Sequence, residues 1–88
     1  MIYKVRFSRD AASYFARLDK PTRRRISDAI DQLAINPYDK NHDVKPLAGR
    51  DDEYRLRVGK YRVIYTIDDD IVLIYVVDIN PRGDVYKK

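Results

Sequence analysis

The stretch Glu53-Tyr-Arg-Leu-Arg-Val-Gly-Lys-Tyr-Arg-Val-Ile-Tyr65 decides the fold, because apolar and polar residues alternate on both sides of Gly59-Lys60. Alternation with period two is typical of a half-buried β-strand. A glycine-containing pair between two such runs is typical of a tight two-residue turn. The sequence therefore predicts a β-hairpin in which Val58 pairs with Tyr61.

This register places arginines opposite each other. Arg57 would face Arg62, and Arg55 would face Ile64 on the same side of the sheet. Like charges directly opposite one another destabilise a sheet, whereas two guanidinium groups together can hold a phosphate. The pattern favours an anion site, and we interpret the anion as a nucleic-acid phosphate. For any one of these arginines taken singly, the solvated face of an ordinary antiparallel sheet is the alternative.

The remaining periodicity completes an α+β fold. The elements that we expect, in chain order, are a strand over 3–7, helices over 9–18 and 21–35, a connecting loop over 37–52, the central hairpin, and an almost wholly apolar strand over 71–79. The chain would thus form an N-terminal strand, an αα-hairpin and a three-stranded antiparallel meander. The helices would pack on one face of a mostly antiparallel sheet, with the last strand buried on both faces.

Composition narrows the class of protein. The chain has 88 residues, so we expect one domain spanning residues 1–88. Lysine and arginine number 18 against 14 acidic residues, and the net charge of +4 favours a polyanionic or acidic partner. Cysteine is absent, which excludes disulfides and thiolate metal sites. No signal peptide or membrane span is recognisable, so we expect a soluble cytoplasmic protein without a membrane partner.

Three segments together carry a family resemblance: Lys45-Pro-Leu-Ala-Gly49, the run from Tyr54 to Tyr65, and Arg82-Gly-Asp-Val-Tyr86. The chain resembles the RelE/ParE superfamily of toxins across almost its whole length, which implies a RelE-like microbial RNase fold. RelE-like members cleave messenger RNA in the ribosomal decoding site, by attack of a ribose 2′-hydroxyl on the adjacent phosphate. ParE-like members poison DNA gyrase. Arg82 and Tyr86 favour the RelE-like branch; a gyrase inhibitor without catalysis and a degenerate nucleic-acid-binding module are the alternatives.

The resemblance also implies roles for individual residues. The RelE-type catalytic pattern falls on Arg55, Arg57, Arg62, Arg82 and Tyr86. Arg57, Arg62 and Arg82 would hold and neutralise the scissile phosphate, and Arg55 would assist through RNA binding. Tyr86 would take part in proton transfer or stack on a base.

One departure from the pattern concerns the general base. The first two positions are often lysines in the best-known members and are arginines here, and arginine does not give up its proton in proteins. His42 stands alone in the long loop, and we interpret it as a solvated side chain. The base is therefore not identified, and Tyr86 is the candidate that is left.

Other charged residues are weaker candidates. Lys60, Arg23 and Arg24 are possible RNA-binding residues, with a solvated surface as the alternative for the helical pair. We interpret the acidic runs 51–53 and 68–70 as turns, because they lack the ligand spacing of a calcium loop. Together with the activity that the resemblance implies, this leads us to expect a metal-independent endoribonuclease that needs no cofactor. Its expected partners are an acidic antitoxin, the ribosome and messenger RNA.

Overall fold

The computed structural model describes residues 2–47, 49 and 52–81. Within them the elements are β1 (Lys4–Phe7), α1 (Arg9–Ala16), α2 (Lys20–Ile35), β2 (Val44–Pro46), β3 (Tyr54–Val58), β4 (Tyr61–Asp68) and β5 (Leu73–Pro81). The strands form one sheet in the order β1-β5-β4-β3-β2. Strand β1 runs parallel to β5, and the other neighbours are antiparallel. The predicted α+β fold and the mostly antiparallel sheet are confirmed.

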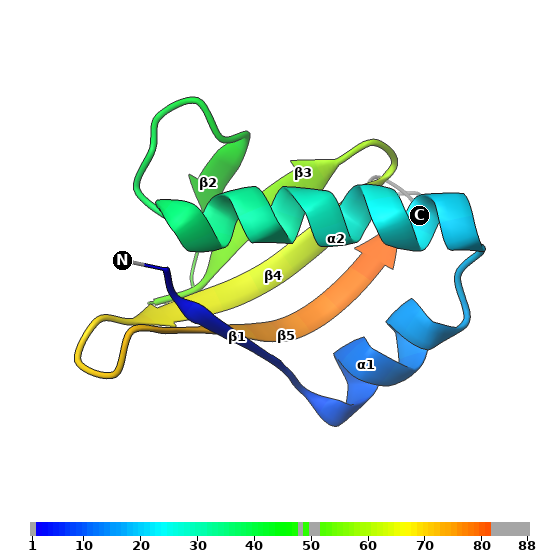
Figure 1. Ribbon diagram of the computed structural model, residues 1–88, viewed down its shortest axis with the longest axis horizontal. Helices are drawn as coiled ribbons and strands as arrows, with labels where there is room; N and C mark the ends of the chain where they lie inside the picture. Colours follow the sequence, from blue (N-terminus) through cyan, green and yellow to red (C-terminus); the bar gives the residue numbers. More distant parts are fainter. Residues whose placement is uncertain (1, 48, 50–51, 82–88) are drawn as a thin grey trace.

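Both helices cover the same face of the sheet. Helix α2 crosses in front of the strands, and α1 lies beside the edge formed by β1 and β5 (Figure 1). Buried side chains from both helices and from β3, β4 and β5 form one core, whose members are Ala11, Ile26, Ile30, Leu33, Ala34, Leu56, Val58, Val63, Tyr65, Ile74, Val76 and Ile79. No helix among the described residues covers the opposite face of the sheet, which we call the uncovered face.

The two helices begin at polar caps. The hydroxyl of Ser8 accepts a hydrogen bond from the backbone N–H of Ala11 at 3.0 Å and donates one to the carbonyl of Val77 at 2.7 Å. A cap on α1 thereby also ties the helix to β5. Asp19 caps α2 by accepting from the backbone N–H of Thr22 at 3.3 Å, so α2 begins slightly earlier than expected.

Helix α1 ends at Ala16, two residues earlier than predicted. The backbone N–H groups of Arg17 and Leu18 bond to the carbonyls of Tyr14 and Phe15, each at 3.1 Å. Bonds to the residue three positions back are those of a tight 3₁₀ turn, which closes the helix.

The predicted loop over 37–52 is wrong in one part, because it contains the short edge strand β2. Val44 pairs with Leu56, and Pro46 with Tyr54. A three-residue strand is too short to show a period of its own. Its pairing with β3 decides its conformation.

The last strand also differs from its prediction of 71–79 with both faces buried. It begins at Leu73, because Val72 has a φ of 54° and Ile71 is 60% exposed in the preceding turn. Tyr75 is 39% exposed, so one face of β5 is only partly covered. The apolar run reflects burial against the helices rather than burial on both sides.

Candidate functional site

The β3–β4 hairpin has the register that the sequence predicts. Val58 pairs with Tyr61, and Arg57 pairs with Arg62. Gly59 has a φ of 56°, which is the conformation that a type II′ turn requires at its first central position. In a hairpin closed by two residues, the pair next to the closing pair is not mutually hydrogen-bonded, so its side chains lie close together. The two arginines are therefore near neighbours.

The arginine face, which we define as Arg55, Arg57 and Arg62, lies on the side of the sheet away from the helices. Leu56 and Val63, which alternate with these arginines, are buried in the core at 4% and 0% exposure. Arg55 lies opposite Ile64, as predicted. The strand period therefore brings the three arginines together on the uncovered face.

A carboxylate holds the first of the two opposed arginines. The Nε of Arg57 donates to Oδ2 of Asp43 at 2.8 Å, and its backbone N–H donates to the Asp43 carbonyl at 2.9 Å. Both side chains are partly exposed, at 40% and 48%. Sequence reasoning missed Asp43, which precedes β2. Its charge offsets part of the repulsion between Arg57 and Arg62, so an external anion is not the sole explanation of the pair.

The side-chain amide of Asn80 holds Arg62, the second arginine of the opposed pair. The Nε of Arg62 donates to Oδ1 of Asn80 at 3.0 Å, and Nδ2 of Asn80 donates to Oδ2 of Asp78 at 2.9 Å. Asn80 lies directly opposite Arg62 in the β4–β5 pairing. Sequence reasoning missed this residue as well. The hint available was only that an asparagine stands two positions after an aspartate at the end of an apolar strand.

A groove of about 380 Å³ lies beside Arg62 on the uncovered face. Its polar lining includes Asp10, Asp78 and Asn80, and its apolar lining includes Ile64. Its volume lies at the lower end of the range that is typical of small-ligand sites. Arg62 itself lines the groove.

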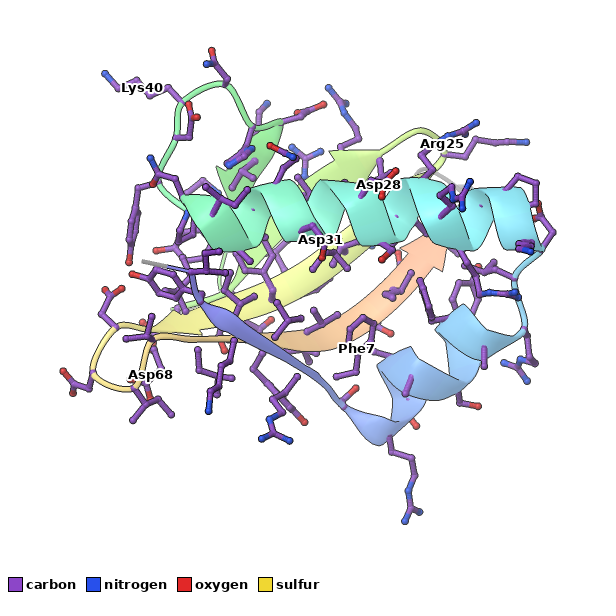
Figure 2. The ribbon with its side chains drawn as sticks, in the orientation of Figure 1. Phe7, Arg25, Asp28, Asp31, Lys40 and Asp68 are labelled. Carbon is purple, nitrogen blue, oxygen red and sulfur yellow. The ribbon has the colours of Figure 1, made fainter. Side chains whose placement is uncertain are left out.

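The other basic candidates, Lys60, Arg23 and Arg24, differ in their surroundings. Lys60 is exposed at the tip, and Arg25 of α2 lies over the turn, with Nη1 3.4 Å from the place that a Cβ would take on Gly59 (Figure 2). Arg24 is exposed. Arg23 instead donates to the carbonyl of Leu18 at 2.5 Å, which gives it a structural role after α1.

Comparison with known proteins decides the family. Residues 5–86 match the family model of the ParE toxin of the type II toxin–antitoxin system parDE. The chain belongs to the RelE/ParE family of type II toxins. It is 37% identical over 65 residues to a Methanocaldococcus jannaschii protein named toxin RelE1, covering 73% of this chain and 72% of that one. It is 30% identical over 90 residues to an Escherichia coli protein named RelE-like toxin protein, covering 98% and 92%.

Solved structures show the same fold for the toxin. The archaeal RelE–RelB complex from Pyrococcus horikoshii superposes with a TM-score of 0.80 at 32% identity, covering 96% of this chain and 99% of that chain. The RelBE2 toxin–antitoxin complex from Mycobacterium tuberculosis gives a TM-score of 0.77 at 26% identity, covering 93% and 100%. The isolated E. coli RelE toxin gives 0.77 at 22% identity, covering 96% and 90%, which shows the shared fold alone.

Two predicted site residues of the toxin, Arg82 and Tyr86, lie outside the described residues. The last described residue, Pro81, pairs with Tyr61 next to the hairpin turn. The described part of β5 thus ends at the same end of the sheet as Arg57 and Arg62. The roles of Arg82 and Tyr86 stay predictions.

The opposite end of the toxin's sheet has a different chemistry. Asp69 accepts hydrogen bonds from the hydroxyls of Tyr3 and Tyr38, each at 2.7 Å. These bonds lower the pKa of Asp69 and raise the pKa of Tyr3, and the bond to Asp69 raises the pKa of Tyr38 to about 12. The three residues connect the segment just before β1, the loop after α2 and the β4–β5 turn.

A second pocket of about 360 Å³ lies between the loop after α2 and the edge of the sheet. Tyr54 and Tyr65 line it with ring centroids 5.7 Å apart. Burial raises the pKa of Tyr65, whose hydroxyl has no hydrogen-bond partner among the described residues. His42, expected to be solvated, is half-buried here, with Nε2 2.8 Å from the carbonyl of Asn36.

The acidic runs lie at turns in the part of the chain that the structure describes. Asp69 and Asp70 lie in the β4–β5 turn, and Asp52 has a φ of 69°. Among residues 2–47, 49 and 52–81, no group of three or more histidine, aspartate or glutamate side chains is arranged to hold a metal ion. No helix in those ranges is long and apolar enough to cross a membrane.

Proposed function

We propose that this toxin is a ribosome-dependent messenger RNA endoribonuclease that inhibits translation. The observation that carries the proposal is the opposed pair Arg57 and Arg62 on the uncovered face, beside a groove. Two guanidinium groups next to a groove suit a phosphate with a flanking nucleotide. The RelE names of the relatives add support.

In the proposed reaction a ribose 2′-oxygen attacks the adjacent phosphorus. The new P–O2′ bond replaces the P–O5′ bond, so the products are a 2′,3′-cyclic phosphate and a 5′-hydroxyl. The 2′-hydroxyl loses a proton, and the leaving 5′-oxygen gains one. Negative charge increases on the phosphate oxygens in the transition state, and we assign its stabilisation to Arg57, Arg62 and Arg82, without a metal ion.

Proton transfer needs a separate group. Arginine does not release its proton, and Arg55 can therefore contribute charge and positioning but not base catalysis. We propose Tyr86 for proton transfer or for stacking on a base. Neighbouring guanidinium groups favour the phenolate form of a tyrosine, which would make Tyr86 a better base than an isolated phenol.

We propose further that an antitoxin binds this toxin and blocks the arginine face. Proteins of similar fold from P. horikoshii and M. tuberculosis are found in complexes with their RelB-type partners. A protein of net charge +4 suits an acidic partner.

Inhibition of DNA gyrase without catalysis is the second candidate, because the matching family model is that of ParE toxins. One experiment separates the two. The toxin is induced in growing cells, and messenger RNA integrity, protein synthesis and DNA supercoiling are followed in the same culture. Early cleavage of messenger RNA supports the proposal, whereas early DNA breaks with intact messenger RNA support gyrase inhibition. No effect on either would mean a nucleic-acid-binding module.

A further inference from the structure

Asn80 occupies the position that orients the central arginine of the site. Its Oδ1 accepts from Nε of Arg62 at 3.0 Å, and its Nδ2 donates to Asp78 at 2.9 Å. The orientation of the amide is determined from both sides. A guanidinium can only donate and an ionised carboxylate can only accept, so a flipped amide would lose both bonds.

We propose that Asn80 is a positioning residue for Arg62, which orients the guanidinium toward a bound phosphate without adding negative charge at that contact. This inference rests on the proposed function and extends it to a residue that lies beside the arginine face. Asp78 stabilises the amide, and the amide in turn holds the arginine.

Arg57, the neighbouring arginine, is held by a charged group instead of a neutral amide. Arg57 is held by a carboxylate, Asp43, directly on its Nε at 2.8 Å. A carboxylate at hydrogen-bond distance competes with a phosphate for the same cation, because both are anions that bind guanidinium through its N–H donors. At the Nε of Arg62 the structure puts an amide instead, and the carboxylate of Asp78 accepts a hydrogen bond from that amide.

Strand pairing holds Arg62, Asn80 and Asp78 next to one another. Arg62 and Asn80 are directly paired across β4 and β5, and Asp78 lies two residues earlier on the same face of β5. All three side chains line the same groove. Their bonds are part-buried, so water competes less for them than at an exposed site. Small displacements of a group that contacts the reacting atoms can cost about 10²-fold in rate, which gives a positioning residue a measurable effect.

The test compares three variants on programmed ribosomes: Asn80→Ala, the exchange Asp78→Asn with Asn80→Asp, and Gln32→Ala. The exchange keeps the composition and both bonds, but it puts the carboxylate directly on Arg62. Gln32 is an exposed amide on α2 and serves as the matched control. The readouts are kcat and KM for messenger RNA cleavage, the salt dependence of binding, and the ¹⁵N–¹H resonance of Arg62 Nε.

We expect Asn80→Ala to lower kcat by roughly 10- to 100-fold and to shift the Arg62 Nε resonance toward that of a solvated guanidinium. The exchange variant should keep a hydrogen-bonded resonance but bind more weakly. Its salt dependence should flatten by about one phosphate contact, a slope change of roughly 0.7 for single-stranded RNA. Gln32→Ala should match the wild type.

Wild-type kinetics and an unchanged Arg62 resonance in Asn80→Ala would overturn the inference. So would an exchange variant that binds and cleaves like the wild type. If the wild type itself fails to cleave, the proposed function is wrong, and the inference is then decided by binding of a 2′-O-methyl oligonucleotide to the same variants. Equal affinity and equal salt dependence in all variants would overturn it in that case too.

Discussion

Charged side chains at the two ends of the sheet have different kinds of hydrogen-bond partners. At the hairpin end, two arginines face each other and are held by Asp43 and Asn80. At the β4–β5 end, one carboxylate, Asp69, takes two tyrosine hydroxyls. Figure 2 shows Arg25 near the first end and Asp68 at the second. Strand β4 joins them over eight residues, a distance of about 26 Å.

This difference in charge leads us to interpret the hairpin end as the functional end of the sheet and the β4–β5 end as a stabilising one. Tyrosine hydroxyls around Asp69 are neutral donors, so these two bonds add no charge of their own to an end that already carries Asp68 and Asp70. The hairpin end keeps like charges adjacent, which costs stability unless something compensates. Asp43 provides part of the compensation within the chain, and a phosphate would provide more. We therefore expect changes at the hairpin end to affect activity and changes at the other end to affect stability.

The largest expected effect lies with Tyr86, which the family pattern assigns to the reacting end. Tyr86→Phe keeps the ring and loses the hydroxyl, so single-turnover cleavage on the ribosome should fall by roughly 10²–10⁴-fold, the usual scale of general acid–base catalysis. Ribosome binding should change little. Tyr86→Ala is the companion variant. A Phe variant at nearly full rate, beside an inactive Ala variant, would show that the ring only stacks on a base.

The second largest effect on cleavage is expected at Arg62. Arg62→Ala removes a donor to the transition-state charge and should lower kcat by roughly 10²–10³-fold. The melting temperature should stay nearly unchanged, because the lost bond to Asn80 is offset by relief of repulsion with Arg57. Arg17→Ala, at an exposed position just after α1, is the control. If stability fell together with activity, Arg62 would be structural and the contrast between the two ends would fail.

At the other end, Tyr65→Phe should leave cleavage unchanged and leave stability unchanged or raise it by up to about 1 kcal/mol. The hydroxyl is buried without a partner among the described residues, and an unmade hydrogen bond of a buried group is costly. A gain of that size would raise the melting temperature by roughly 4–8 °C in a domain of this length. Tyr54→Phe, which removes a less buried hydroxyl from the same ring pair, should change little. A destabilised Phe variant would reveal a partner for the Tyr65 hydroxyl.

The smallest expected effect is a pH dependence centred on Asp69. Its hydrogen bonds from Tyr3 and Tyr38 lower its pKa, so their contribution to stability is present above about pH 4 and is lost as pH falls through the folded-state pKa. The raised pKa of Tyr38, about 12, makes the same bond persist below about pH 10 and disappear as pH rises toward that value.

The melting temperature, followed across pH, checks this prediction. The difference between the wild type and Asp69→Asn should form a plateau between about pH 5 and pH 9 and shrink at both extremes. Asp70→Asn, at the exposed neighbouring position, is the control and should show no such plateau. A difference that stays constant into acid would mean that the tyrosine bonds do not depend on the charge of Asp69.

Much of the hairpin end could be predicted. Period-two alternation and a two-residue turn together determine which residues oppose each other, because a slip of one residue would turn every side chain to the other face. The opposed pair Arg57 and Arg62 followed from that logic and is confirmed. Strand β2 did not follow, because three residues carry no period.

The acceptors of the two arginines could not be predicted. Asp43 is 14 residues from Arg57 in the chain, and Asn80 is 18 residues from Arg62. Opposed arginines without visible partners favoured an external anion as the explanation. Their pairing with Asp43 and Asn80 shows that local acceptors account for part of that arrangement.

The sequence by itself determined the helices, the hairpin, its register and the family resemblance, because periodicity, caps and turn chemistry act between near neighbours in the chain. Only the tertiary structure decided which face stays uncovered, that β1 lies parallel to β5, and which polar groups hold each arginine. Those outcomes depend on strand pairing between distant segments. Such pairing is decided by the packing of the whole core, and no local pattern encodes it.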